Sequence, residues 1–296
     1  MKTITVFTPT YNRMHLLKRV YRSLMNQTDY DFIWLVIDDG STDKTKEYIM
    51  SLQNDKNPFD IEYIYKENGG LHTAYNEAIK LLNTELCICC DSDDWLPNHC
   101  IEFIKKYWDE KKTDECAGII ALDYTKDNIV IGKKLPDEEY IDLNELFIKG
   151  KLIGDKKLVV RSKLYQEITP MQTINNEKNF NPNYYNVIIS EKYNWICLNE
   201  NLCYVEYQPS GMTNNIFKQY CNSPNSFIEL RKLYLTLNKA TLIFKCRQVL
   251  HYDAECILAH RTNDIFNNTS PNKFLSILLF PFGFCLYIYI YFKGNK

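Results

Sequence analysis

The feature that most constrains the fold is a regular alternation of short apolar runs and amphipathic segments over the first 122 residues. Apolar or alternating runs bounded by polar residues predict buried strands. They cover residues 4–8, 32–37, 61–65, 85–90 and 117–122. Strands joined by single helices predict right-handed βαβ units, and therefore an α/β fold with a mostly parallel central sheet flanked by helices.

The segments between these strands carry their apolar residues on one helical stripe. Asn12 is expected to cap a helix that runs to Met25, and Ser41 to cap a second that runs to about Leu52. Two further helices are predicted over residues 71–82 and 97–108. Beyond residue 123 the pattern is less regular, with strands expected at 158–160 and 202–207 and helices from 217 to 261.

Polar motifs follow the ends of four predicted strands. Parallel strands place their carboxyl ends at one edge of the sheet, which is where ligands bind in open α/β folds. We therefore expect the four motifs to share one edge. They are Thr10-Tyr11-Asn12, Asp38-Asp39, Asn68-Gly69-Gly70 and Asp91-Ser92-Asp93.

The acidic cluster Asp91-Ser92-Asp93-Asp94 begins where the apolar run 85–90 stops. Three carboxylates that emerge together repel one another, and a hard divalent cation is the usual partner for such oxygens. The alternative is a solvated acidic turn that opens the next helix, where Asp is also favoured.

The edge predicts a nucleotide site. The ring of Tyr11 could contact a base, and Asp39 could accept a hydrogen bond from an imide N–H, which selects uracil. The Gly69-Gly70 turn lets backbone amides approach a phosphate. Asp91 and Asp93 could share a ribose hydroxyl and a cation that bridges two phosphates. Each motif taken alone is also explained by ordinary turn chemistry.

In this order the motifs resemble the family 2 glycosyltransferases, which have the GT-A fold. The resemblance covers about the first 120 residues and includes Pro9-Thr10-Tyr11-Asn12-Arg13 and Asp38-Asp39-Gly40-Ser41-Thr42-Asp43. It implies that Asp93 is catalytic and that Asp93 and Asp94 hold Mn²⁺ or Mg²⁺. It also implies that the nucleotide sugar is bound by Pro9, Thr10, Tyr11, Arg13, Asp39, Asn68, Gly69, Gly70, Thr73, Asp91 and Ser92.

Enzymes of this kind invert the anomeric centre, and a carboxylate general base takes the proton of the acceptor hydroxyl. Asn183 and Tyr184 stand where the resemblance places acids, and an amide cannot act as a base. Glu177 and Glu191 are substitutes that spacing alone does not separate. Asp155 is a further candidate, although it also fits an ordinary turn.

Composition restricts the partners and the compartment. The net charge of −2 gives no electrostatic footprint for nucleic acid. The eleven cysteines are scattered and odd in number, which favours buried thiols in a reducing compartment. The first residues contain no long apolar segment, so a cytoplasmic chain is expected.

The expected organisation is a GT-A domain over residues 1–215, a helical extension over 216–262, and a polar linker with an apolar tail over 263–296. The nucleotide-binding half of that domain is expected at about 1–122 and the acceptor half at 123–215. The uncharged run 274–292 is close to the ~20 residues of a membrane span. Pro281 and the repeated Tyr residues favour an interfacial helix, with a span or a buried core helix as alternatives.

Residues 206–213 resemble a segment of bacterial relatives that build surface glycans, which implies a glycan or lipid-linked glycan acceptor at the cytoplasmic face of the membrane. The predicted function is therefore an inverting, metal-dependent transferase of hexosyl type that uses a UDP-sugar in cell-surface polysaccharide biosynthesis. A sugar-nucleotide-binding protein with little transferase activity is the alternative, because Asn183 and Tyr184 replace acids. A nucleotidyltransferase ranks last, because residues 8–13 contain no glycine.

Overall fold

The computed structural model describes residues 2–208, 211, 213–267 and 270–295. The chain divides into two compact units. The first contains Met1–Leu146, Gly150–Pro170 and Tyr185–Glu206, and the second contains Phe147–Lys149, Met171–Tyr184 and Tyr207–Lys296. The half predicted to hold the acceptor, 123–215, is therefore shared between both units.

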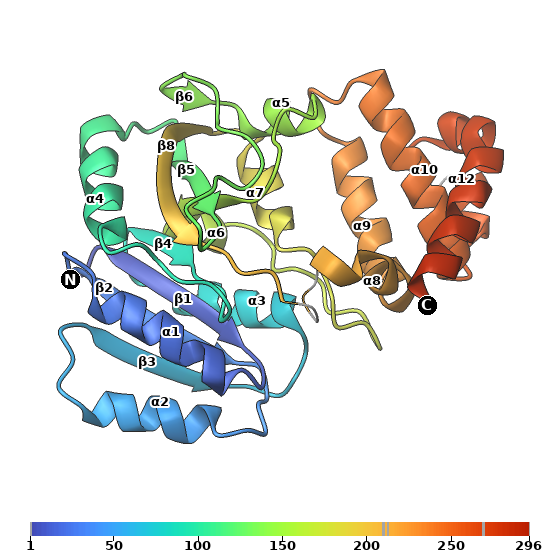
Figure 1. The fold of residues 1–296 in the computed structure, drawn as a ribbon. Coiled ribbons are helices and arrows are strands. Elements are labelled where there is room, and N and C mark those ends of the chain that lie inside the picture. The colour runs from blue at the N-terminus through green and yellow to red at the C-terminus, as the bar shows by residue number, and fades with distance from the viewer. Residues whose placement is uncertain (1, 209–210, 212, 268–269, 296) are drawn as a thin grey trace. The chain divides into compact units, whose positions relative to one another are not determined.

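The first unit contains one eight-stranded sheet with the order β3-β2-β1-β4-β7-β5-β8-β6 (Figure 1). The pairs β1–β2, β2–β3, β1–β4 and β5–β8 are parallel, which confirms the predicted mostly parallel sheet. Strand β7 runs antiparallel between β4 and β5, an insertion that the alternation did not reveal. The strands are β1 Ile4–Thr10, β2 Phe32–Asp38, β3 Asp60–Tyr65, β4 Leu86–Cys89, β5 Cys116–Tyr124, β6 Tyr140–Ile141, β7 Lys156–Arg161 and β8 Asn194–Tyr204.

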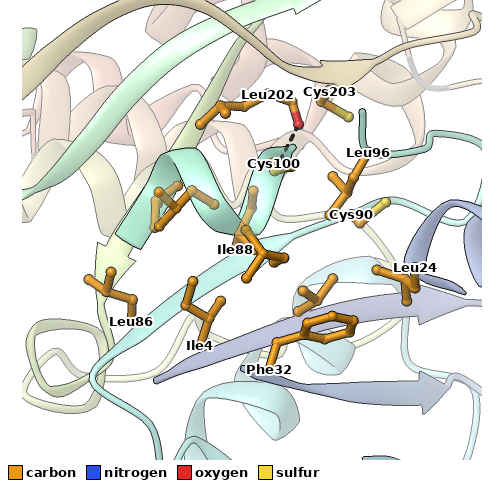
Figure 2. Close-up of a cluster of buried hydrophobic side chains, with 14 of the residues drawn as sticks. Ile4, Leu24, Phe32, Leu86, Ile88, Cys90, Leu96, Cys100, Leu202 and Cys203 are labelled. Atoms are coloured by element: carbon orange, nitrogen blue, oxygen red, sulfur yellow. Dashed lines mark hydrogen bonds between the residues drawn. The ribbon is translucent and has the colours of Figure 1, made fainter. Parts of the chain in front are cut away.

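Helices pack on both faces of this sheet because successive side chains of a strand point to opposite faces. Ile4, Phe32 and Ile88 face α1, α2 and α4, where they form the main apolar cluster (Figure 2). Phe7 faces the other side and meets Tyr75 of α3, with ring centroids 5.1 Å apart. The helices of this part of the chain are α1 Met14–Met25, α2 Thr45–Asn54, α3 Leu71–Leu81, α4 Cys100–Lys111, α5 Leu143–Ile148, α6 Ser162–Gln166 and α7 Asn183–Ile189.

Six of the eleven cysteines are buried, as expected, whereas four are partly buried and Cys285 is exposed. Cys90, Cys100 and Cys203 are buried in the main apolar cluster, and the Cys100 thiol donates to the carbonyl oxygen of Leu202 at 3.4 Å (Figure 2). All eleven cysteines are free thiols.

The two predicted helix caps are wrong. Helix α1 begins at Met14 and α2 at Thr45, and neither Asn12 nor Ser41 caps its own helix. Asn12 has φ +52°, and its Oδ1 accepts from the backbone N–H of Thr42 at 2.7 Å. The Ser41 hydroxyl accepts from the Asn12 N–H at 2.8 Å. These polar side chains therefore join the loops after β1 and β2 to each other. They stabilise the edge of the sheet and not the starts of the helices.

The second unit is helical, as predicted for its sequence. Helix α10 packs against both α9 and α12. Helix α12 is long and apolar enough to cross a membrane by length and composition, and it continues through Pro281. The elements are a 3₁₀ turn at Thr213–Asn215 and helices α8 Ile216–Asn222, α9 Pro224–Leu235, α10 Leu242–Leu258, α11 Asn263–Phe266 and α12 Lys273–Gly294.

Candidate functional site

The four polar motifs lie at one edge of the sheet, as predicted. Strands β3, β2, β1 and β4 are consecutive neighbours and all parallel, so their carboxyl ends lie side by side. The loops also bond to one another: the N–H of Asp39 donates to the carbonyl oxygen of Thr10 at 2.9 Å. The edge is therefore a single connected surface.

Asp39 organises the part of this surface that follows β2 and β3. Its side chain is buried, and the Lys66 ammonium donates to Oδ1 at 2.6 Å. The backbone N–H groups of Gly69 and Gly70 donate to the carboxylate at 3.0 and 2.8 Å. Side chains of Asn68 and Thr73 add further bonds. The carboxylate therefore fixes this turn, and the two N–H groups that the sequence predicted for a phosphate donate to Asp39 instead.

Glycines allow the loops after β2 and β3 to approach each other. Gly40 has φ +84°, and a Cβ there would lie 2.7 Å from the backbone nitrogen of Asn68. Gly70 has φ +94° and precedes the first residue of α3. A side chain at Gly40 would push the two loops apart, and a side chain at Gly70 would be strained by the positive φ.

The motif after β1 presents one large ring. Tyr11 is 47% exposed at the edge, whereas Pro9 and Thr10 are buried within β1. An exposed planar ring at the end of the strand can stack on a nucleobase, whereas the buried pair can only shape the backbone beneath it.

The acidic turn after β4 is held by an arginine from the β1 loop. Arg13 Nη1 donates to Asp93 Oδ2 at 3.0 Å and reaches the Ser92 hydroxyl at 3.4 Å. Burial raises the pKa of Asp93 and Arg13 opposes that shift, while neighbouring Asp91 adds to it. The Arg13 guanidinium therefore already places a positive group at the oxygen predicted to bind a metal.

Asp94 lies differently from Asp93. Its side chain is buried, and its Oδ2 is 3.8 Å from the ammonium of Lys157 on β7. Lys157 also donates to the carbonyl oxygen of Cys89 at 3.3 Å and faces the buried Asp123 of β5. Burial raises the pKa of Asp94 to about 8 and that of Asp123 to about 6, with Lys157 opposing both shifts. To bind a metal, Asp94 would have to leave this pair.

The residues at the turn fit a divalent metal in one respect. Asp93 supplies a hard carboxylate oxygen that already pairs with a cation, which matches the preference of Mn²⁺ and Mg²⁺. Within the described part of the chain, no three His, Cys, Asp or Glu side chains are grouped to hold a metal on their own. Ligand oxygens from a bound diphosphate would have to complete the coordination.

The candidates for the general base have distinct surroundings. Glu177 is buried in the second unit, where its carboxylate accepts from the N–H groups of Asn225 and Ser226 at the start of α9. Asn183 also belongs to the second unit, and its amide donates to the Tyr234 hydroxyl at 3.4 Å. Tyr184 is half-buried and carries no carboxylate.

Two further carboxylates lie in the first unit. Asp155 is exposed beside β7 and acts electrostatically on Asp123, raising its pKa. Glu191 accepts from the amide of Asn144 at 2.8 Å at the end of α7. The sequence around Asp155 and Glu191 did not single out either residue. The roles of Asp155 and Glu177 as general base stay predictions.

Three charged residues of the edge were missed by the sequence analysis: Lys66, Lys157 and Arg19. Lys157 had a usable signal, because a lysine directly before Leu158-Val159-Val160 in a buried strand requires an acidic partner. Lys66 and Arg19 carry no such signal, since each lies among ordinary polar positions. Of the predicted surface-glycan segment 206–213, Pro209, Ser210 and Met212 lie outside the described residues.

Comparisons with known proteins agree with this geometry. Residues 5–169 match the sequence model of Glycosyl transferase family 2. An uncharacterized glycosyltransferase of Mycoplasma genitalium is 31% identical over 127 residues, which are 42% of this chain and 41% of the relative. The chondroitin synthase of Pasteurella multocida is 33% identical over 114 residues, 38% of this chain and 12% of the relative. The match thus covers less than half the length of either relative.

Solved structures share the fold. S. aureus TarS 1–349 in complex with UDP-GlcNAc has a TM-score of 0.59 and 20% identity, covering 90% of this chain and 75% of that one. The mannosyltransferase PcManGT from Pyrobaculum calidifontis, in complex with GDP-Man and Mn²⁺, has a TM-score of 0.57 and 13% identity, covering 99% and 83%. These likenesses concern the fold alone, and they confirm the predicted GT-A architecture.

Proposed function

The chain belongs to glycosyl transferase family 2, and from this membership we propose that it is an inverting glycosyltransferase that transfers a hexosyl group from a UDP-sugar. The observation that carries the proposal is the connected edge formed by the ends of β1, β2, β3 and β4. Across the edge, in the order β3, β2, β1 and β4, lie a glycine turn, a buried carboxylate, an exposed ring and an acidic turn, which gives a base and a diphosphate separate places to bind. TarS with bound UDP-GlcNAc and PcManGT with bound GDP-Man support a nucleotide-sugar donor at such a fold.

The donor would be oriented from its base to its diphosphate along this edge. Tyr11 would stack on the base, and Asp39 would accept from the uracil imide in place of its longest present bond, that from Thr73 at 3.4 Å, while it holds Asn68, Gly69 and Gly70 in place. Asp91 and Ser92 would lie toward the ribose. Pro9 and Thr10 would shape the strand end beneath them.

The diphosphate would lie at the acidic turn. Arg13, which pairs with Asp93 in this structure, is placed to turn toward the phosphate oxygens when the donor binds. Asp93, with Asp94 as the further predicted ligand, would hold Mn²⁺ or Mg²⁺, and the metal would supply Lewis-acid stabilisation of the departing diphosphate. Mn²⁺ bound to PcManGT supports this choice of cofactor.

Transfer needs a base for the acceptor hydroxyl, and Asp155 is the candidate that we favour. It is exposed in the same unit as the acidic turn, whereas the oxygens of Glu177 already cap α9. The acceptor oxygen would attack the anomeric carbon as the bond to the diphosphate breaks, and Asp155 would take the proton.

A second function is favoured by one observation. Asn183, where an acid is expected, is an amide that donates to Tyr234 and has no basic oxygen of the required strength. The chain would then bind sugar nucleotides with little or no transfer. Incubation of the protein with radiolabelled UDP-sugars and Mn²⁺, with and without a membrane glycolipid fraction, separates the two functions. Donor hydrolysis or transfer supports the enzyme, and tight UDP binding without turnover supports the binding protein.

The acceptor is proposed to be a glycan or lipid-linked glycan at the cytoplasmic face of the membrane. Helix α12 supports this, because large apolar side chains such as Phe274, Phe282 and Phe292 are more than 60% exposed along it. The opposite side of α12 packs on α10. A helix with one packed side and one exposed apolar side fits a position in the plane of the membrane surface. The chondroitin synthase relative is consistent with a polysaccharide product.

A further inference from the structure

Arg19 on α1 contacts the main chain of the acidic turn. Its Nη2 donates to the main-chain carbonyl oxygen of Asp93, and its Nη1 donates to Glu206 Oε2 at 2.5 Å. Its guanidinium also lies over the ring of Trp95, 4.2 Å from the centroid. We propose that Arg19 is a positioning residue that fixes the backbone of the acidic turn, and thereby the Asp93 carboxylate, for metal binding. This inference rests on the proposed function.

Two arginines thus hold one aspartate from two sides. Arg13 pairs with the side chain of Asp93, and Arg19 binds the carbonyl oxygen of the same residue. When a ligand draws Arg13 away, the Arg19 bond still holds the peptide. A planar guanidinium with several fixed donors can bond a carbonyl, pair with a carboxylate and cover a ring at the same time, which a lysine cannot do.

The residue after the acidic cluster is anchored by the same arrangement. Trp95 exchanges backbone hydrogen bonds with Tyr204 at 3.1 and 2.8 Å, and the two rings stack with centroids 5.3 Å apart. Glu206 lies two residues beyond Tyr204, so Arg19 links α1 to the turn and to the end of β8. The turn is therefore attached at Asp93 by Arg19 and at Trp95 by β8.

Removal of the Arg19 side chain would release the Asp93 peptide. A hydrogen bond from a charged donor is worth enough that its loss should weaken metal-dependent UDP binding by about tenfold to a hundredfold. Binding of UDP without metal should change by less than about twofold, because Tyr11 and Asp39 make no contact with Arg19. A general loss of structure would weaken UDP binding both with and without the metal.

The control is Arg22, one turn later on α1. Arg22 and Arg19 both line a cavity of about 460 Å³ with Trp95 and Tyr204, but Arg22 has none of the three contacts described above. An Arg19 substitution could also lower UDP affinity by disturbing a ligand bound in that cavity. In that case a substitution of Arg22 would lower it too.

The experiment is a UDP titration of the full chain, with and without Mn²⁺, for wild type, Arg19→Ala, Arg19→Lys and Arg22→Ala. The inference predicts that Arg19→Ala loses most of the gain in affinity that Mn²⁺ gives, that Arg19→Lys lies between it and wild type, and that Arg22→Ala matches wild type. If Arg19→Ala fails to fold, Arg19→Lys carries the comparison. If Mn²⁺ increases UDP affinity in the Arg19 variants as much as in wild type, the role of Arg19 is wrong but the proposed metal site stands. The same holds if Arg22→Ala loses as much of this increase as Arg19→Ala does. No Mn²⁺ gain in wild type overturns both the inference and the proposed metal site.

Discussion

Lys157→Met is the substitution that tests the electrostatics beneath the acidic turn. Lys157 is 8% exposed and Asp94 5% exposed, so neither charge is well solvated. At about pH 9, above the pKa of about 8 at which Asp94 ionises, removing one partner of this buried pair costs about 3–5 kcal/mol, because the other charge is left uncompensated. Asp94→Asn alone should lower the free energy of unfolding by about 1–2 kcal/mol. This is less than the cost of Lys157→Met, because Lys157 keeps Asp123 as a partner.

The double variant Lys157→Met/Asp94→Asn should lose about 1–3 kcal/mol less free energy of unfolding than the two single variants lose together, because it leaves no unpaired Asp94 carboxylate. Urea unfolding followed by tryptophan fluorescence measures this, since all four tryptophans lie in the first unit. Lys163→Met, at an exposed position of α6, is the control for loss of a lysine. If Lys157→Met costs less than about 1 kcal/mol, or if the single effects are additive, Lys157 and Asp94 do not form an energetically coupled pair.

Three further predictions concern the second unit and the base. Burial raises the pKa of Asp253 to about 7, so the folded state keeps a proton that the unfolded state has lost between about pH 4 and 7. Stability should therefore fall as pH rises through this window, and Asp253→Asn should flatten the dependence of the calorimetric melting temperature between pH 5 and 8; parallel slopes would contradict this. Phe282→Ser should weaken binding to anionic lipid vesicles in flotation assays by about tenfold, because apolar area is lost. Ile129→Ser, at a position that is also exposed but lies in the first unit, should leave the binding unchanged. Equal effects of the two substitutions would count against a contact between α12 and the membrane. Glu177→Ala should lower the stability of the second unit by about 1–2 kcal/mol by removing the α9 cap while transfer persists; a loss of transfer with unchanged stability would identify Glu177 as the base.

The edge of the sheet could be predicted because its signals are local. Each strand of the first half is an apolar or alternating run, and each ends at polar or glycine residues that cannot continue a buried strand. Parallel order then brings Tyr11, Asp39, Asn68 and Asp93 to one side without any knowledge of the loops.

The remaining features depend on contacts between distant segments. Strand β7 enters the sheet between β4 and β5, and nothing in residues 156–161 states which strands will be its neighbours. Asn12 and Ser41 look like helix caps because their residue type suits a cap, but the loop-to-loop bonds that they make instead involve residues about 30 positions away. Arg19 reaches Glu206 across 187 positions, a pairing that no local pattern encodes.

The extent of α12 lies between these cases. Its apolar composition predicted a helix of membrane-spanning length, and the structure contains one across Pro281. The packing of α12 on α10, including the approach of Gly283 to the side chain of Asp253, could not be predicted, because it requires the relative placement of two helices.

Asp93 is proposed to form the metal and diphosphate end of a nucleotide-sugar site. Calorimetric titration of UDP into wild type and Asp93→Asn, with Mn²⁺ and with EDTA, tests this proposal most directly. Mn²⁺ should tighten UDP binding to wild type by at least about tenfold, and Asp93→Asn should bind UDP equally with and without the metal. Equal affinities of wild type in Mn²⁺ and EDTA, or an undiminished metal effect in Asp93→Asn, would contradict it.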